Sequence, residues 1–309
     1  MERYDVIIVG AGPAGLTAGL YSGRAKLKTL VLDMFFPGGT LLKTEKIEDY
    51  PGFEEIAGSE LAKRMEDHTR KFGAEIKSES VTQIVWKEKL KEVKTEEGEY
   101  GAGVVIIAAG GEPKKLNIPG EGEFSGRGVS YCAICDGPFF RDQDLVIIGG
   151  GTSAVEEAIY LTRYGRKVTI IHRRDTFRAQ KIVQEKAFDD PKIEVLWNTV
   201  VEEIKGKDSV QTLALKNLQS GKRSNLDATG VFIFIGFIPN QVKGIHPEHD
   251  EGGFLVTNEN METSCPGIYA VGDIRSQPVR QVTNAAGDGT ISAVMAEKYL
   301  EEHNLRVGS

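Results

Sequence analysis

The chain has 309 residues, 40% of them hydrophobic, which is enough for two domains of ordinary size with buried cores. Its formal net charge of -7 argues against nucleic acid or an anionic membrane as the main partner. Three cysteines in so long a chain argue against a structural disulfide framework. We expect a soluble, cytoplasmic protein, because the first apolar run, Asp5–Gly10, is too short for a signal peptide or a membrane span.

The first predicted unit is a strand, a glycine-rich turn and a helix. The strand ends in a dinucleotide-binding fingerprint, and a helix from Pro13 to about Ala25 follows. The residues of this turn are Gly10, Gly12, Pro13, Ala14 and Gly15. The next strand, Thr29–Asp33, ends at the residue that meets the adenosine ribose in such units. Because Asp33 accepts from ribose hydroxyls and repels a 2′-phosphate, this site suits FAD or NAD(H).

The segment after the first unit predicts a helix and several strands. An amphipathic helix is expected over 59–72, and short alternating strands over 75–94. The run from Gly103 to Gly110 reads as a buried strand. Glu112-Pro113 then favours a crossover into another domain.

The sequence Cys132-Ala-Ile-Cys135-Asp136 places a carboxylate directly after a C-x-x-C pair. A zinc site would need two more ligands at comparable spacing, but Cys265 stands alone and the histidines are scattered. We therefore interpret the pair as a redox dithiol. A thiolate is the attacking species in disulfide exchange, so Asp136 is a candidate for moving protons.

A second fingerprint follows the dithiol and repeats the spacing of the first. It predicts a strand from Asp144, a turn, a helix over 153–164 and a strand over 167–172. The turn residues are Gly149, Gly151, Thr152, Ser153 and Ala154. The second strand ends in a basic cluster made of His172, Arg173, Arg174 and Arg178. Guanidiniums at the ribose position favour a 2′-phosphate, so this site predicts NADPH. The alternative is a basic helix start that makes surface ion pairs.

The order of these segments predicts an inserted domain. The Gly- and Pro-marked stretch 236–247 is a second crossover, and 282–303 reads as a long closing helix. The predicted fold class is α/β, with two Rossmann-like nucleotide-binding domains, one for FAD or NAD(H) and one for NADPH, the second inserted in the first. The FAD- or NAD(H)-binding domain would comprise 1–113 and 246–309. The NADPH-binding domain, with the dithiol, would comprise 114–245.

Taken together, these motifs resemble the low-molecular-weight NADPH-dependent thioredoxin reductases over nearly the whole chain, with a dithiol just before the NADPH fingerprint as the distinguishing trait. The resemblance implies further residues around FAD, with Asp273 on the ribityl chain. These are Gly38, Gly39, Thr40, Asp49, Gly272, Asp273, Arg280, Gln281 and Val282. Thr40 and Asp49 depart from a usual Gln and Asn, and Ala109 and Thr152 from a frequent Thr and a frequent Asp or Asn.

The resemblance also implies an electron path. NADPH reduces FAD, FAD reduces the Cys132–Cys135 disulfide, and the dithiol reduces thioredoxin. Cys135 would lie nearer the flavin and Cys132 would attack the partner, in a homodimeric enzyme. We expect a hinge rotation near 112–115 and 238–245, because both NADPH and the dithiol must reach the flavin. Alternative acceptors are a glutaredoxin-like or peroxiredoxin-system protein, and a non-catalytic flavin redox sensor is a different class.

Overall fold

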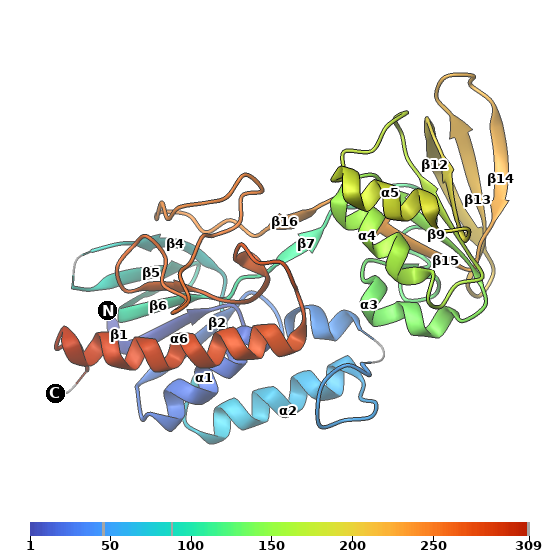
Figure 1. The fold of residues 1–309 in the computed structure, drawn as a ribbon. Helices are drawn as coiled ribbons and strands as arrows, with labels where there is room; N and C mark the ends of the chain where they lie inside the picture. The colour runs from blue at the N-terminus through green and yellow to red at the C-terminus, as the bar shows by residue number, and fades with distance from the viewer. Residues whose placement is uncertain (45–46, 88, 308–309) are drawn as a thin grey trace. The chain divides into compact units, whose positions relative to one another are not determined.

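The computed structural model describes residues 1–44, 47–87 and 89–307 and divides into two compact units (Figure 1). Unit 1 is Met1–Glu112 with Ile238–Ser309, and unit 2 is the inserted segment Pro113–Phe237. The predicted α/β class, with two Rossmann-like units and the second inserted in the first, is confirmed.

The second crossover falls within the expected stretch 236–247, and the boundary between the units, at Phe237 and Ile238, lies earlier in the chain than the expected 245. At both crossovers the chain runs through a two-stranded sheet of β7 (Gly111–Pro113) and β16 (Phe237–Pro239). Directly afterwards, the backbone N–H of Asn240 donates to the carbonyl of Gly110 at 3.0 Å. Ile245 is then buried against the sheet of unit 1. The stretch 240–245 therefore packs with the first unit, although its composition marks it as a linker.

Unit 1 is built on a seven-stranded sheet in the order β3-β2-β1-β6-β5-β4, with β17 also paired to β6. Strands β1, β2, β3, β6 and β17 are parallel, whereas β4 and β5 form an antiparallel extension. The first half of β6 pairs with β5 and the second half with β17. The bounds are β1 Glu2–Val9, β2 Thr29–Asp33, β3 Glu75–Ser78, β4 Val81–Val85, β5 Lys91–Thr95, β6 Glu99–Ile107 and β17 Ile268–Ala270.

Both faces of the parallel strands are buried, which explains their nearly continuous apolar runs. On one face, Val6 and Ile8 of β1 pack with residues of α1 (Pro13–Arg24) and α6 (Val282–Glu302). Figure 1 shows α6 and α1 side by side, with α2 (Gly58–Lys71) next to α1. On the other face, Ile7 packs with Ile245 and Leu255 of the long loop before β17. The short helices of this unit are η1 (Gly39–Lys43) and η3 (Gly272–Ile274).

Unit 2 has a parallel sheet in the order β11-β10-β9-β15-β8. One face packs on α3, α4 and α5, and the other on an antiparallel sheet, β12-β13-β14. The strands are β8 Val129–Ser130, β9 Asp144–Gly149, β10 Lys167–Ile171, β11 Ile193–Leu196, β12 Thr199–Gly206, β13 Val210–Asn217, β14 Arg223–Asp227 and β15 Gly230–Phe234. The helices are α3 Ala133–Asp136, η2 Gly137–Phe140, α4 Thr152–Leu161 and α5 Lys181–Asp189.

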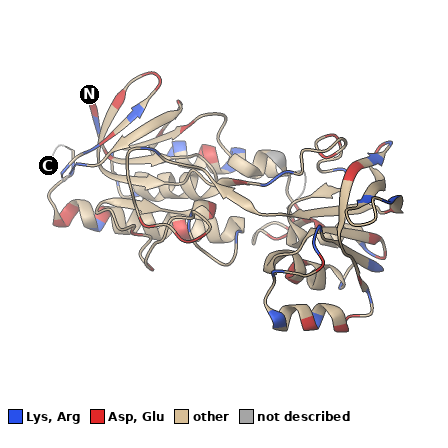
Figure 2. Ribbon diagram, turned by 90° about the horizontal axis from the view of Figure 1, so that it is seen from above, with Lys and Arg blue, Asp and Glu red and all other residues tan. Residues whose placement is uncertain are grey.

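Acidic and basic residues are interspersed along both units (Figure 2). Many of them form exposed ion pairs, such as Arg64 with Glu60 and Arg223 with Glu202. Within the described ranges, none of the helices combines the length and the apolarity that a membrane span requires.

Candidate nucleotide and dithiol sites

The first glycine loop leaves open space at the N-terminus of α1. Gly10 has φ +108°, and a Cβ there would lie 2.3 Å from the carbonyl oxygen of Ala108. A Cβ on Gly15 would lie 1.9 Å from the oxygen of Gly10, so this glycine permits close helix–strand packing. A Cβ on Gly12 would meet no described atom within 4 Å. The helix N–H groups therefore face space that a pyrophosphate fits.

The structure brings the end of β2 and the Gly38–Gly39 turn to this loop. One carboxylate oxygen of Asp33 accepts from the N–H of Ala11 at 2.6 Å, and the other from Phe35 at 3.0 Å. The N–H of Gly38 donates to Ala11 at 2.7 Å, and a Cβ on Gly39 would lie 3.1 Å from the Cα of Gly12.

Thr40 and Asp49, which stand where Gln and Asn are usual in the thioredoxin reductases that the chain resembles, are both exposed. Thr40 lies in η1, and Asp49 lies in the loop that the Ile47–Ile56 bridge closes.

The Gly272–Asp273 turn reaches the same loop from the other end of the chain. Gly272 has φ +71°, and a Cβ there would lie 3.0 Å from the Cβ of Ala14. Burial raises the pKa of Asp273, against the lowering effect of Arg280. The Nε of Arg280 donates to the carbonyl of Asp273 at 3.4 Å, and Gln281 and Val282 begin α6. A half-buried carboxyl next to the first glycine loop suits a polar ligand with hydroxyl groups, such as the ribityl chain of FAD.

The second glycine loop repeats the opening of the first. A Cβ on Gly151, at the start of α4, would meet no described atom within 4 Å. The third glycine of the fingerprint is replaced by Ala154, which is fully buried. Its Cβ lies 2.6 Å from where a Cβ on Gly149 would be, so Gly149 makes room for it. Thr152 and Ser153 form the first turn of α4.

The basic cluster lies against this second loop. His172 is buried, and a Cβ on Gly150 would lie 2.2 Å from its imidazole ring. Burial lowers the pKa of His172, and the positive charges of Arg174 and Arg178 lower it further, which favours a neutral ring. The backbone N–H of Arg178 donates to Gly150 at 2.8 Å, and the side chains of Arg173, Arg174 and Arg178 are exposed. Exposed guanidiniums in the segment that packs beside an open phosphate loop fit a nucleotide with a further phosphate.

Cys132 and Cys135 form a disulfide with their Cα atoms 5.3 Å apart. Cys132 caps α3, and its Sγ accepts from the N–H of Cys135 at 3.2 Å. The hydroxyl of Ser130 accepts from the N–H of Cys132 at 3.0 Å and donates to its carbonyl at 3.2 Å. Asp136 ends α3 and is half-buried. Among the described residues no cluster of His, Cys, Asp and Glu has the arrangement of a metal site.

Sequence reasoning missed three side chains that support these sites. Asp288 and Arg275 form an ion pair at 3.4 Å beside Gly272, and Glu121 accepts from the hydroxyl of Tyr131, next to Cys132. Asp288 could have been noticed in the sequence, because it stands between two glycines, Gly287 and Gly289, inside the predicted closing helix.

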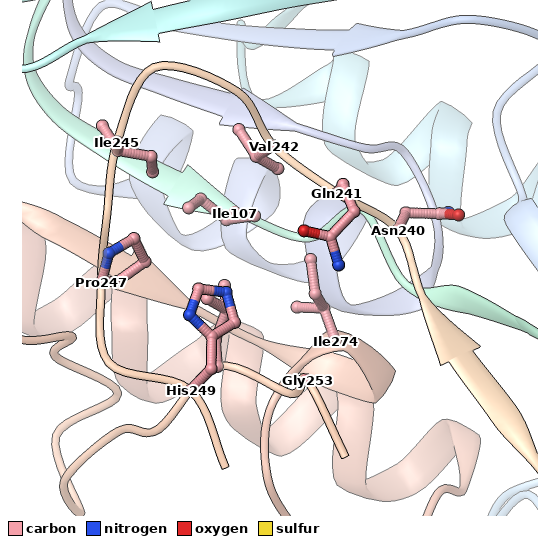
Figure 3. Close-up of a pocket in the computed structure, with 10 residues that line it drawn as sticks. Ile107, Asn240, Gln241, Val242, Ile245, Pro247, His249, Gly253 and Ile274 are labelled. Carbon is pink, nitrogen blue, oxygen red and sulfur yellow. The ribbon is translucent and has the colours of Figure 1, made fainter. Parts of the chain in front are cut away.

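A cavity of about 10 Å³ also lies in unit 1, where Gln241 and His249 face Ile107 and Ile274 (Figure 3). It has room for about one water molecule.

Comparisons with known proteins agree with this geometry. The family of pyridine nucleotide-disulphide oxidoreductases matches residues 4–289. A thioredoxin reductase of Bacillus subtilis is 48% identical over 302 residues, covering 97% of this chain and 95% of the relative. The solved thioredoxin reductase of Streptococcus pyogenes is 45% identical with a TM-score of 0.92. That of Lactococcus lactis, in a conformation designated FR, is 46% identical with a TM-score of 0.66. Both alignments cover 97% of this chain and 99% of the other. The chain therefore belongs to the pyridine nucleotide-disulphide oxidoreductases, and within them to the FAD- and NADPH-dependent thioredoxin reductases.

Proposed function

We propose that this chain reduces thioredoxin with electrons from NADPH, through FAD and the Cys132–Cys135 pair. The observation that supports this most is the disulfide itself, held in a short turn of the unit that also contains the basic second nucleotide site. In this assignment unit 1 binds FAD through Gly12, Gly39 and Asp273. Unit 2 binds NADPH through Gly151 and the arginines after β10.

FAD, when bound, accepts a hydride from NADPH and supplies two electrons to a disulfide. The thiol–disulfide exchange steps that follow are carried out by the cysteines of the protein. The thiolate of Cys132 attacks one sulfur of the thioredoxin disulfide, and the other sulfur leaves as a thiolate. Cys135 then attacks Sγ of Cys132, which reforms the internal disulfide and releases reduced thioredoxin. The N–H of Cys135, which donates to Sγ of Cys132, favours the thiolate form, and Asp136 is proposed to move the protons.

The acceptor would dock on the apolar surface around the dithiol turn. Ile134 lies between the two cysteines and Phe139 follows in η2, and both are more than a third exposed. Large apolar side chains exposed beside a redox pair suit a protein partner better than a small thiol. A double variant, Ile134→Ser with Phe139→Ser, should raise KM for thioredoxin while the NADPH-dependent reduction of a small disulfide reagent is retained.

A change in the orientation of the two units is part of the proposal. The dithiol and the NADPH site belong to one unit and the FAD site to the other, so both must reach the same flavin. The two solved relatives have nearly equal identity but TM-scores of 0.92 and 0.66, so they differ from each other in conformation. An engineered disulfide that fixes one orientation should abolish turnover. Full turnover in the cross-linked protein would exclude the hinge.

We also propose a homodimer in the cytoplasm, the compartment in which NADPH-dependent thiol reduction operates. Tyr21 of α1 and Ile291 and Val294 of α6 are exposed. They lie on neighbouring helices, and a groove of about 350 Å³ is lined by α1, α2 and α6. A second copy would cover this apolar surface. Sedimentation of Val294→Asp beside the wild type tests the assignment, since a charge there should shift the dimer toward monomer.

The test of function is an anaerobic colour experiment. NADPH should bleach the yellow flavin, and oxidised thioredoxin should restore the colour in the wild type but not in Cys132→Ser. Failure of NADPH to bleach would refute the NADPH assignment. Rapid recolouring of Cys132→Ser by thioredoxin would refute the dithiol route. A glutaredoxin-like or peroxiredoxin-type protein that restores the colour far faster than thioredoxin would identify a different acceptor.

A further inference from the structure

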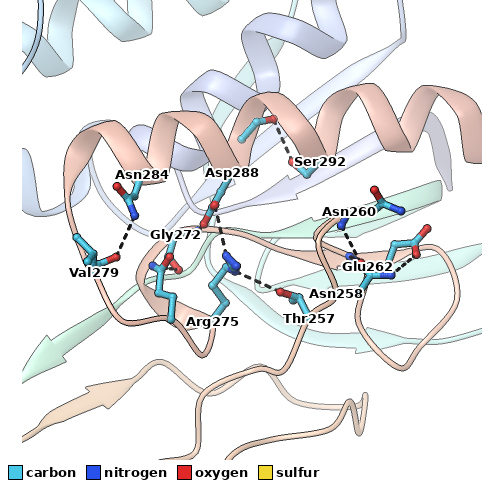
Figure 4. Close-up of polar contacts among 12 residues, drawn as sticks. Thr257, Asn258, Asn260, Glu262, Gly272, Arg275, Val279, Asn284, Asp288 and Ser292 are labelled. Atoms are coloured by element: carbon cyan, nitrogen blue, oxygen red, sulfur yellow. Dashed lines mark hydrogen bonds and ion pairs between the residues drawn. The ribbon is translucent and has the colours of Figure 1, made fainter.

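Asp288 of α6 is a buried carboxylate with two partners in the turn around η3 of unit 1 (Figure 4). The residue is only 8% exposed. One oxygen accepts from the N–H of Gly272 at 3.0 Å, and the other pairs with the guanidinium of Arg275 at 3.4 Å. Arg275 also donates to the hydroxyl of Thr257 at 3.2 Å. Asp288 therefore ties the closing helix to the turn that contains Asp273.

The Gly272–Asp273 turn, which Asp288 contacts, is conformationally restricted. Gly272 adopts φ +71°, which a side chain would strain, and it packs against Ala14 in the first turn of α1. Its carbonyl accepts from the side-chain amide of Gln277 at 3.0 Å. At the next residue of α6, a Cβ on Gly289 would lie 2.3 Å from the carbonyl of Ala14. The closing helix, the Gly272 turn and the phosphate-binding end of α1 are thus packed as one body.

The charge of Asp288 matters in this arrangement. The side chain of Arg275 is only 15% exposed. A guanidinium in such a place is costly without a charged partner, and a neutral carboxyl would leave Arg275 uncompensated. A hydrogen bond to a carboxylate is also stronger than one to a neutral carboxyl. Loss of the charge would therefore weaken the N–H bond to Gly272 and the pair with Arg275 together.

We infer that Asp288 is a positioning residue for FAD: its carboxylate fixes the Gly272–Asp273 turn, and protonation of Asp288 loosens the bound flavin. The inference rests on the proposed FAD site in unit 1 but on neither the electron acceptor nor the dithiol. Asp288 itself touches the turn and Arg275, and it acts on the flavin through Asp273.

The direction of the pH dependence follows from burial. Burial raises the pKa of Asp288, while the N–H of Gly272 and the charge of Arg275 lower it less strongly. Protonation therefore begins at a higher pH than for an exposed aspartate, and FAD affinity should fall on the acid side of neutrality. Asp273 and Arg280 also face this region, and the pKa of Asp273 is raised by burial. Because both remain in every variant, the difference between variants reports Asp288.

The experiment measures FAD binding by ultrafiltration and flavin absorbance, between about pH 5 and 7.5. Asp288→Asn keeps the size of the side chain and an acceptor for Gly272 but removes the charge. We expect its FAD dissociation constant at neutral pH to rise about tenfold, a loss comparable to that of one hydrogen bond to a charged group. Arg275→Met should show a similar rise. The acid-side loss of FAD expected in the wild type should be smaller in Asp288→Asn, in which Asp273 still titrates.

A matched control is Glu297→Gln on the same helix, which removes an ion pair with Arg306 at 3.5 Å far from Gly272. Its FAD affinity should equal that of the wild type. Urea unfolding with and without FAD separates positioning from general stability. Equal FAD affinity and pH profile in Asp288→Asn and the wild type would overturn the inference. So would equal losses of stability in the FAD-free and FAD-loaded forms. A wild type that binds no FAD would instead refute the cofactor assignment.

Discussion

The hydroxyl of Tyr131 donates a hydrogen bond of 2.8 Å to Oε1 of Glu121, a carboxylate that is only 3% exposed. Glu121 also accepts from the N–H groups of Leu116 and Asn117, at 2.9 and 2.7 Å. Those two residues follow the crossover at Pro113, and Tyr131 directly precedes Cys132. One carboxylate thus connects the beginning of unit 2 to the strand that enters the dithiol turn.

Tyr131→Phe removes only the hydroxyl from this connection. We expect the free energy of unfolding to fall by about 1.5–3 kcal/mol, the range for a hydrogen bond to a charged group. Urea unfolding in the disulfide form measures it. Tyr160→Phe is the control, because it removes a half-buried hydrogen bond of 3.1 Å to the neutral hydroxyl of Tyr164 and should cost less. Equal losses in the two variants would contradict the special role of Glu121.

Substitution by alanine should have different effects at two glycines of the first loop, on FAD binding at one and on stability at the other. Gly12 has φ −73° and open space around it, so Gly12→Ala should fold and yet lose FAD, because the methyl group would enter the space proposed for the pyrophosphate. A Cβ on Gly15 would collide with the backbone of Gly10, so Gly15→Ala should lower the stability of the FAD-free protein as well. Flavin absorbance and thermal unfolding together test the pair. Full FAD content in Gly12→Ala would disprove the phosphate assignment.

The basic cluster predicts a change of coenzyme preference. Arg174 is exposed and its backbone is fixed by the N–H of Asn198 at 3.0 Å, so Arg174→Gln should leave the loop in place. Loss of one charge-assisted phosphate contact should raise KM for NADPH by about 10- to 100-fold, with KM for NADH nearly unchanged. The ratio of kcat/KM for the two coenzymes is the measurement. Arg163→Gln, elsewhere in unit 2, serves as a charge control. A parallel loss with NADH would argue against a 2′-phosphate contact.

The sequence predicted those parts of the fold that short-range patterns determine. The two glycine loops were found because their spacing and the adjoining apolar strands are local. Strand β12 was missed because a bulge between Val201 and Glu203 interrupts the alternation that marks a strand. Helix α5 was missed because few of its residues are buried, chiefly Val183 and Ala187.

The supporting residues around the sites were not predicted, because their contacts join segments that are far apart in the sequence. Asp288 reaches Gly272 across a turn and part of a helix, and Glu121 reaches Tyr131 around a loop. No periodic pattern links such pairs. The boundary between the units was expected at 245 instead of 237 for the same reason, because the bond from Asn240 to Gly110 joins segments that are distant in the chain. Local composition identifies loops and strands, but tertiary packing decides which unit a loop joins.

Lys91 is fully buried in the sheet of unit 1. From its burial we predict that the free energy of unfolding increases at alkaline pH. Its Nζ donates to the carbonyl of Gly103 at 2.9 Å and lies 5.1 Å from the ring centre of Tyr299. Burial lowers the pKa of Lys91 from 10.5 to about 8. The unfolded chain therefore binds this proton more tightly than the folded chain does. The free energy of unfolding should rise as the pH increases above about 8, toward the pKa of the unfolded side chain.

Lys91→Met keeps the length of the side chain and removes the proton-binding group. Urea midpoints between about pH 7 and 9.5 should climb in the wild type and stay flat in the variant, below the range in which tyrosines ionise. At neutral pH the variant should be at least as stable as the wild type, because the cost of burying a charge offsets the lost bond to Gly103. Lys94→Met on the same strand is the control, since Lys94 pairs with Glu99 at the surface. A wild type whose midpoint does not change over this range would show that Lys91 keeps an ordinary pKa despite its burial.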